Sequence, residues 1–186
     1  MNNTDNIFVW SDTHFHHTNI MKFCPETRPF LNVDEMNEGL IKAWNSAVGD
    51  KTIFFLGDFS FSHKTEEISS IFERLSGEKY LIRGNHDKKE TTRLPWKGVF
   101  EYREVYVADE KFVLCHYPLS SWNNIRRGAY HLFGHVHGNY VPGKNNLRMD
   151  DVGVDNGYPA PVSLSEMMSK LQNRQKVEFT WGDENA

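Results

Sequence analysis

Short apolar runs alternate with amphipathic stretches in the first half of the chain. Apolar runs at residues 7–10, 52–56 and 80–83 predict strands. Residues 34–48 and 65–75 repeat apolar side chains at helical spacing, and Asp34 and Gly49 suit the first helix as N-cap and stop. Because strands alternate with helices here, the pattern indicates an α/β fold.

Strands dominate the second half of the chain. The pattern predicts strands at residues 105–108, 111–115, 130–133, 147–154 and 177–181. A helix at 163–171 has a capping box, in which Ser163 is followed three residues later by Glu166. Together the two halves predict an α/β domain in which two mixed β-sheets are stacked between helices.

Metal-binding side chains follow five of the predicted strands. The loops concerned are Ser11-Asp12-Thr13-His14, Gly57-Asp58, Gly84-Asn85-His86-Asp87, His116 and Gly134-His135-Val136-His137. In open α/β sheets the carboxyl ends of the strands line the ligand crevice, so we expect these loops to converge. The glycines let the backbone turn sharply at these points.

The spacing and chemistry of these side chains suit a metal site. Asp12 and His14 are two positions apart, as are His135 and His137, so in an extended segment each pair points to one side and could chelate. Two carboxylates, one amide oxygen and four imidazoles are too many ligands for one tetrahedral ion and suit two ions with a shared ligand. Nitrogen and oxygen donors without thiolate fit Mn, Fe, Zn, Ni or Co.

The ordered blocks D-x-H, G-D, G-N-H-D, a lone His and G-H-x-H resemble the signature of the calcineurin-like metallophosphoesterase superfamily. They run from Asp12 to His137, about two-thirds of the chain. The stretches SDTHF, GDFSF and GNHD look like the small bacterial and bacteriophage members of this superfamily. Each block recurs by chance, but the ordered set is specific. The resemblance implies a four-layer sandwich and one domain over residues 1–186 without a cap domain.

The resemblance also implies two divalent metal ions, with manganese favoured. The implied ligands of the first ion are Asp12, His14 and His137. Those of the second ion are Asn85, His116 and His135. Asp58 is expected to bridge the ions, because a shared carboxylate offsets the repulsion between two close cations.

The implied reaction is hydrolysis of a phosphate ester by a metal-bridging hydroxide, which attacks phosphorus in line with the leaving group. His86 is expected to act as general acid, because the pKa of a histidine lies near working pH. The chain departs from the protein phosphatases of the superfamily, whose GDxxDRG block places an Asp and an Arg where this chain has Phe61 and Ser62. That difference argues against a protein phosphatase and leaves open which residue orients His86.

Without a cap domain, we expect an open groove that takes a small phosphodiester, a cyclic nucleotide or a nucleotide monoester, with the diester favoured. Arg126, Arg127 and Tyr117 are candidate substrate contacts beside Asn85, since guanidinium and aromatic groups suit a nucleotide. A solvated basic loop is the alternative for the two arginines. Phe61 is expected to pack in the core or at its rim.

Four histidines lie outside these assignments. One of His16 and His17 is a candidate support for a metal ligand, and a solvent-facing position is the alternative for both. His63 and His131 are expected to be plain surface or sheet residues.

Composition limits the partners. The 186 residues carry a net charge of −4, which gives no electrostatic footprint for a long nucleic acid. Cys24 and Cys115 suggest no disulfide scaffold, the N-terminus does not resemble a signal peptide, and no apolar run would span a bilayer, so a cytoplasmic location is expected. The oligomeric state is left open.

Two other functions are compatible with the resemblance. One is a metal-binding interaction scaffold that has lost catalysis, although such proteins typically lose ligands and here every position is filled. The other is a nuclease that acts on short oligonucleotides, since the acidic net charge disfavours only a long polymer.

Overall fold

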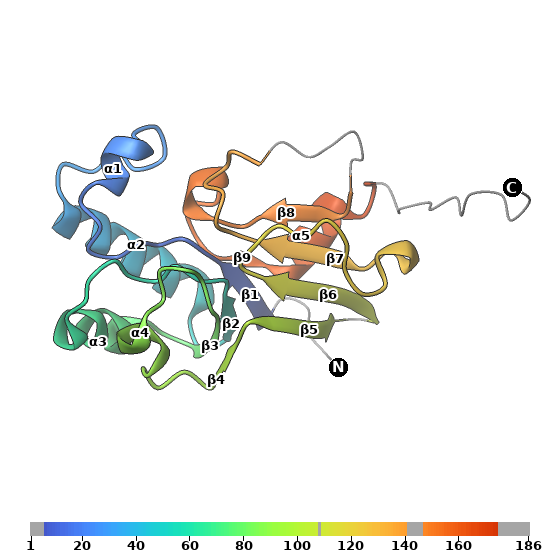
Figure 1. Cartoon of the computed structure of the whole chain (residues 1–186), viewed down its shortest axis with the longest axis horizontal. Coiled ribbons are helices and arrows are strands. Elements are labelled where there is room, and N and C mark those ends of the chain that lie inside the picture. The colour runs from blue at the N-terminus through green and yellow to red at the C-terminus, as the bar shows by residue number, and fades with distance from the viewer. Residues whose placement is uncertain (1–5, 108, 141–146, 175–186) are drawn as a thin grey trace, which may run out of the picture.

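A computed structural model describes residues 6–107, 109–140 and 147–174 of the chain. Two mixed sheets with flanking helices form the fold, as the sequence predicts (Figure 1). The first sheet has the order β4-β3-β2-β1-β9, with the bounds β1 Ile7–Trp10, β2 Thr52–Phe55, β3 Glu78–Ile82, β4 Gly98–Phe100 and β9 Val162–Ser163. Its strands are parallel except for β9.

The second sheet has the order β5-β6-β7-β8. Its strands are β5 Tyr102–Val107, β6 Glu110–Cys115, β7 Tyr130–Phe133 and β8 Met149–Asp151. Strand β5 is antiparallel to β6, whereas β7 and β8 continue the sheet in parallel. Strand β8 is shorter than the predicted 147–154, β5 begins earlier than predicted, and the predicted strand at 177–181 lies outside the described residues.

Five α-helices and two 3-10 helices are found among the described residues outside the strands. They are α1 Ile20–Phe23, α2 Val33–Val48, α3 Thr65–Arg74, α4 Lys89–Thr92 and α5 Leu164–Leu171, with 3-10 helices η2 Ile125–Arg127 and η3 Val154–Asn156. Among the described residues, no helix is both long and apolar enough to cross a membrane.

The ends of the helices follow local chemistry. The predicted N-cap Asp34 is wrong, because the side chain of Asn32 accepts the hydrogen bond from the Glu35 amide and α2 begins at Val33. Gly49 ends α2 at a φ of 56°, as predicted. The capping box of α5 is confirmed, since Ser163 and Glu166 bond to each other's backbone amides.

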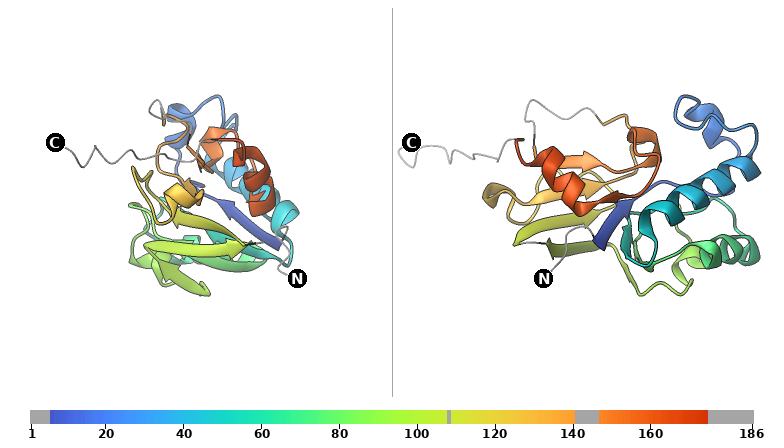
Figure 2. Two further views of the ribbon diagram at one scale, coloured as in Figure 1. Left: turned by 90° about the vertical axis from the view of Figure 1, so that its right-hand side faces the viewer. Right: turned by 180° about the vertical axis from the view of Figure 1, so that it is seen from behind.

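Apolar side chains pack in three clusters that hold these layers together. One lies between α2, α3 and the first sheet and contains Trp44, Phe55 and Phe72. A second lies between the two sheets and includes side chains of α5, with Val9, Leu114 and Met167 among its members. The third includes Trp122 and Ile125 beside β6 and β7. Figure 2 shows α2 and α3 on the side of the first sheet and α5 beside β9.

Candidate metal centre

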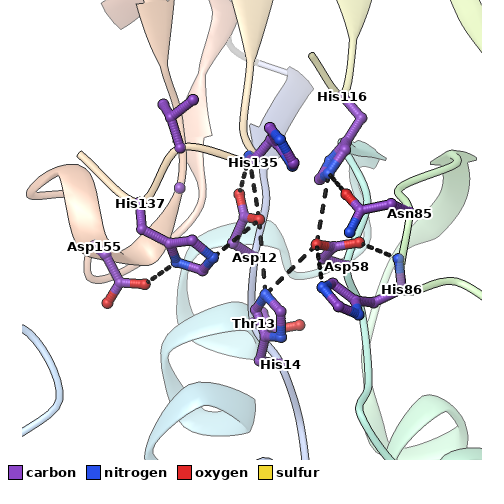
Figure 3. A network of polar contacts seen from close by, with 12 residues as sticks. Asp12, Thr13, His14, Asp58, Asn85, His86, His116, His135, His137 and Asp155 are labelled. Atoms are coloured by element: carbon purple, nitrogen blue, oxygen red, sulfur yellow. Dashed lines mark hydrogen bonds and ion pairs between the residues drawn. The ribbon is translucent and has the colours of Figure 1, made fainter. Parts of the chain in front are cut away.

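The carboxyl ends of strands from both sheets meet at one place (Figure 3). Asp12 follows β1, Asp58 follows β2, and Asn85 and His86 follow β3 of the first sheet. The second sheet contributes His116 after β6, then His135 and His137 after β7. The structure therefore brings together the seven expected metal ligands and His86.

The carboxylate of Asp58 lies at the middle of the group. Its Oδ2 atom is 3.6 Å from Nε2 of His14, 3.5 Å from Nε2 of His116 and 4.0 Å from Nε2 of His86. Its Oδ1 atom accepts a 2.8 Å hydrogen bond from the backbone amide of His86. One carboxylate oxygen thus faces histidines that belong to both expected metal positions.

The candidate ligands, with Asp58 included, divide into two sets. The ligand atoms of each set lie within 4.8 Å of one another, and the sets are Asp12 with His14 and His137, and Asp58 with His116 and His135. The Oδ1 atom of Asn85 lies 3.0 Å from Nε2 of His116 and so joins the second set. His135 and His137 fall into different sets, so this pair does not chelate a single ion in this arrangement.

The backbone at these ligands is not extended, which corrects the sequence-based argument for their direction. The φ angles are 57° at Asp12, 47° at His14, 58° at Asp58, 73° at His135 and 49° at His137. Residues with side chains rarely adopt this left-handed region, and such strain clusters at functional sites. The side chains converge because of these turns rather than because of strand alternation.

Two of the motif glycines are required by close approach. A Cβ atom at Gly84 would collide with the carboxylate of Asp58, and one at Gly134 would collide with the carboxylate of Asp12. Both loops therefore run directly against a candidate ligand, and only glycine leaves it room.

His14 shows that these residues fit a metal ion. Its side chain is 3% exposed, and both ring nitrogens are buried without a hydrogen-bond partner among the described residues. Burial lowers its pKa well below the usual value, which favours the neutral imidazole that binds metals. A buried imidazole without hydrogen-bond partners costs folding free energy. A cation bound between this ring and the two neighbouring carboxylates would give it a partner.

The carboxylates and histidines of the cluster have shifted pKa values, because they are buried and lie close to one another. Burial raises the pKa of Asp12 to about 7. Burial opposes the charged forms of Asp58 and His116 as well, but their hydrogen bond and mutual attraction outweigh it, so the pKa of Asp58 falls to about 2 and that of His116 rises to about 9. Such opposed shifts in one cluster are typical of functional sites.

A buried ion pair that the sequence analysis missed supports His137. Nδ1 of His137 lies 2.7 Å from the carboxylate of Asp155. The guanidinium of Arg28, which is 1% exposed, bonds to both oxygens of Asp155 at 2.9 Å and to the backbone oxygens of Asp12 and Thr13. A carboxylate behind a metal-binding histidine fixes the orientation of its ring.

Nothing in the sequence pattern pointed to this ion pair. Arg28 lies in the connection between α1 and α2, and Asp155 lies in η3 after the last motif block. Cys24 also lies within reach of His137 and Asp155, but the Asp155 oxygens are already held by Arg28 and Thr27.

Asp87, the last residue of the G-N-H-D block, ties two of the loops together. Its buried carboxylate accepts hydrogen bonds from the backbone amides of Asp58, Phe59 and Gly84, at 2.9, 3.0 and 2.8 Å. This side chain fixes the loop after β2 against the loop after β3, and so sets the position of Asp58 relative to Asn85.

His86 lies at the rim, with its side chain 39% exposed. Its ring lies 5.2 Å from the ring of Phe61 and 5.5 Å from that of His14. Among the described residues, no side chain forms a hydrogen bond with the ring of His86. Phe61 is 40% exposed, so it stands at the rim of the site rather than in the core.

The candidate substrate contacts lie in two places. Tyr117 is 42% exposed, and its ring lies 5.0 Å from that of His116 and 4.8 Å from that of His135. Arg126 and Arg127 are in η2, which precedes β7, whereas His135 follows its other end. They line a separate cavity of about 500 Å³, so their role in substrate binding stays a prediction.

The other histidines are distributed between structure and surface. His16 bonds to Asn37 of α2, and His17 stacks on Phe61 with ring centroids 3.8 Å apart. His131 is fully buried in β7 and bonds to the backbone of Val113 and Leu119, which confirms it as a sheet residue. His63 is exposed, as expected.

Comparison with known proteins identifies the family and the fold. Residues 6–157 match the family model of the calcineurin-like phosphoesterase superfamily domain. The chain is 39% identical over 183 residues to the uncharacterized protein MJ1445 of Methanocaldococcus jannaschii, covering 95% of this chain and 97% of that protein. The crystal structure of the protein of unknown function AQ665 from Aquifex aeolicus has the same fold, with a TM-score of 0.72 at 23% identity over 88% of this chain and 98% of that one.

The chain belongs to the calcineurin-like phosphoesterase superfamily, because the family model spans most of its length. Membership makes it a hydrolase of phosphate esters. Divalent metals are typical of the family, and the buried cluster around Asp58 has the donors to hold them.

Proposed function

We propose that the chain hydrolyses phosphate esters with two divalent metal ions held on either side of Asp58. Asp12, His14 and His137 would hold one ion, and Asn85, His116 and His135 the other. The observation that carries the proposal is the position of Asp58 Oδ2, 3.6 Å from His14 Nε2 and 3.5 Å from His116 Nε2. Manganese is the favoured metal, with Fe, Zn, Ni or Co as alternatives for this nitrogen and oxygen donor set.

When bound, the ions would activate a water as nucleophile and withdraw charge from the phosphoryl oxygens. The protein contributes the rest. Asp87 and the Arg28–Asp155 pair hold the ligands in place before substrate arrives, so little reorganisation is needed during the reaction. His86 donates a proton to the departing oxygen, and its exposed ring can reach a substrate that enters from solvent.

A small phosphodiester is the favoured substrate, and a nucleotide monoester is the second choice. The rim positions of His86 and Tyr117 support an open site, which fits the expectation of one domain without a cap. Tyr117, Asn85, Arg126 and Arg127 remain the proposed substrate contacts. A cytoplasmic location is proposed because Cys24 and Cys115 are free thiols.

Turnover of chromogenic phosphodiesters and phosphomonoesters with each metal in turn tests this proposal. We expect a diester to be hydrolysed fastest with Mn²⁺. Asp58→Asn and Asn85→Ala should lower both metal content and rate, whereas His86→Ala should lower the rate by about 10²–10⁴-fold with metal content retained. His63→Ala, at an exposed histidine, is the matched control and should behave as wild type.

The same assays separate the alternatives. A protein that binds two equivalents of metal but turns over no substrate in the panel would be an interaction scaffold. A preference for short oligonucleotides, with affinity that falls steeply with salt, would indicate a nuclease.

A further inference from the structure

A row of rings borders the site on the side of His86. The Phe61 ring lies 5.2 Å from that of His86 and 6.2 Å from that of His14, and His17 stacks on it at 3.8 Å with an interplanar angle of 7°. His17 in turn lies 6.3 Å from Phe23, which is 70% exposed. An apolar ring therefore remains 40% exposed immediately beside the proposed general acid.

The position of Phe61 is fixed by the backbone. Its amide donates a 2.9 Å hydrogen bond to the oxygen of Phe15, and the hydroxyl of Ser60 donates to the same oxygen at 3.0 Å. Phe15 in turn donates its amide to Phe59, so the segment after β2 is paired with the segment after β1. The backbone is thus held in place, and stacking on His17 holds the ring beside His86 before any substrate binds, which limits the entropy lost when a ligand contacts it.

The proposed role of His86 as general acid determines which part of the substrate would lie beside the Phe61 ring. A general acid must lie within hydrogen-bond reach of the leaving oxygen, so the leaving group occupies the His86 side of the site. A planar leaving group can stack against an exposed aromatic ring there, whereas a small alkyl group gains little from it. Tyr117 instead contacts His116 and His135, which are the candidate ligands of the second metal ion.

We propose that Phe61, supported by His17, is a binding surface for the leaving group, and that the enzyme prefers phosphodiesters whose leaving alcohol carries a planar ring, such as an aryl group or a nucleoside. This inference rests on the proposed function, because it assigns the leaving group to the side of His86. It makes Phe61 a specificity-determining residue that contacts substrate and takes no part in proton transfer.

The test compares two methyl phosphodiesters whose leaving groups have similar acidity, one aryl and one fluoroalkyl. The Mn²⁺-loaded protein is assayed as wild type, Phe61→Leu and Phe61→Ala. Phe61→Leu keeps an apolar side chain of similar size, so it guards against loss of folding. Tyr106→Ala, at an exposed aromatic residue of β5, is the matched control.

We expect wild type to favour the aryl ester in kcat/KM, and Phe61→Leu to reduce this preference about three- to tenfold, mainly through KM. The loss of kcat/KM in Phe61→Leu should be smaller with the fluoroalkyl ester than with the aryl ester. Equal loss with both esters would overturn the proposal, since it would mean that the ring positions His86 instead. An unchanged preference in Phe61→Leu and Phe61→Ala would overturn it as well.

A binding measurement separates this proposal from the proposed function. Phenylphosphonate should bind the metal-loaded wild type more tightly than methylphosphonate, and Phe61→Ala should remove that difference. If both esters are hydrolysed but phenylphosphonate binds no more tightly than methylphosphonate, the proposal that Phe61 binds the leaving group is wrong and the proposed function stands. No turnover of any phosphate ester, with phenyl-selective binding intact, would instead overturn the proposed function.

Discussion

Five candidate ligands occupy the left-handed region of backbone conformation, and each such residue costs on the order of 1–3 kcal/mol. The cost is sustained by the contacts around them. Asp87 holds three backbone amides of the loops after β2 and β3, and Arg28 holds the backbone oxygens of Asp12 and Thr13. The protein therefore arranges its ligands through buried polar contacts of its own.

Asp155→Asn tests the support of His137. The variant keeps the shape of the side chain but removes the charge that faces Nδ1 of His137. We expect the affinity of one of the two metal equivalents to fall about 10–100-fold, since this is the usual effect of losing a carboxylate behind a metal-binding histidine. Calorimetric Mn²⁺ titration of the chelator-treated protein measures it, with Asp50→Asn on the surface as control. Equal loss at both sites would contradict the assignment.

Arg28→Met tests the ion pair itself. The substitution leaves the buried carboxylate of Asp155 without its cation, so we expect the free energy of unfolding to fall by about 3–5 kcal/mol. The double variant Arg28→Met with Asp155→Asn should recover part of this loss, because no unpaired charge then remains buried. Urea denaturation of the metal-free proteins gives both values. A double variant less stable than Arg28→Met would argue against this explanation.

The sequence was sufficient to predict which candidate ligands lie together, but it did not predict the contacts that support them. Asp12, Asp58 and Asn85 stand directly after strands, where the topology of an α/β sheet gathers side chains whatever the details of the loops. Arg28 and Asp155 lie 127 positions apart, and neither position follows a strand in a motif block. Their pairing depends on how two loops pack, which local pattern does not encode.

At the scale of elements, the long helices could be predicted from the sequence, whereas several of the shortest elements could not. The sixteen-residue helix α2 and the ten-residue helix α3 have enough apolar repeats to show helical periodicity. The four-residue helices α1 and α4 and the two-residue strand β9 do not. β9 exists because Val162 and Ser163 pair with the free edge of β1, a contact made across most of the chain.

His131 makes the second sheet sensitive to acid. Its ring bonds to Val113 and Leu119 in the neutral form, and burial lowers its pKa from 6.5 to about 4. Between these values the unfolded chain takes up a proton that the folded chain does not, so stability is present above pH 6.5 and is lost as the pH falls towards 4. At about 1.4 kcal/mol per pKa unit, the loss has an upper bound of about 3.5 kcal/mol.

Urea denaturation of metal-free protein between pH 7 and pH 4 measures this loss against His131→Gln. The glutamine can donate to Val113 and accept from Leu119 but does not titrate. Wild type should therefore lose more stability over this range than the variant, by about 2–3 kcal/mol. Parallel pH profiles for the two proteins would show that His131 does not titrate with folding.

At the scale of the molecule, the site exists only where the two sheets meet. The first sheet contributes Asp12, Asp58 and Asn85, and the second contributes His116, His135 and His137. A cation shared between such ligands would link the sheets, so we expect metal binding and folding to be coupled.

Added Mn²⁺ should therefore stabilise the whole protein. At one hundred times the dissociation constant, each site should add about 2.7 kcal/mol to the free energy of unfolding, and Tm should rise with metal concentration. Differential scanning calorimetry with and without chelator measures the change. Asp58→Asn should abolish most of it. A Tm that does not respond to any transition metal in wild type would contradict the coupling.

The contact of Gly84 and Gly134 with the two carboxylates also limits how the enzyme can diversify. Any larger side chain at either position would displace Asp58 or Asp12, so these two positions cannot be substituted without moving a candidate ligand. New substrate preferences would arise at the border, where Phe61 and Tyr117 are exposed and are not themselves candidate ligands. Libraries that randomise these two positions are therefore the direct route to redesigning its selectivity.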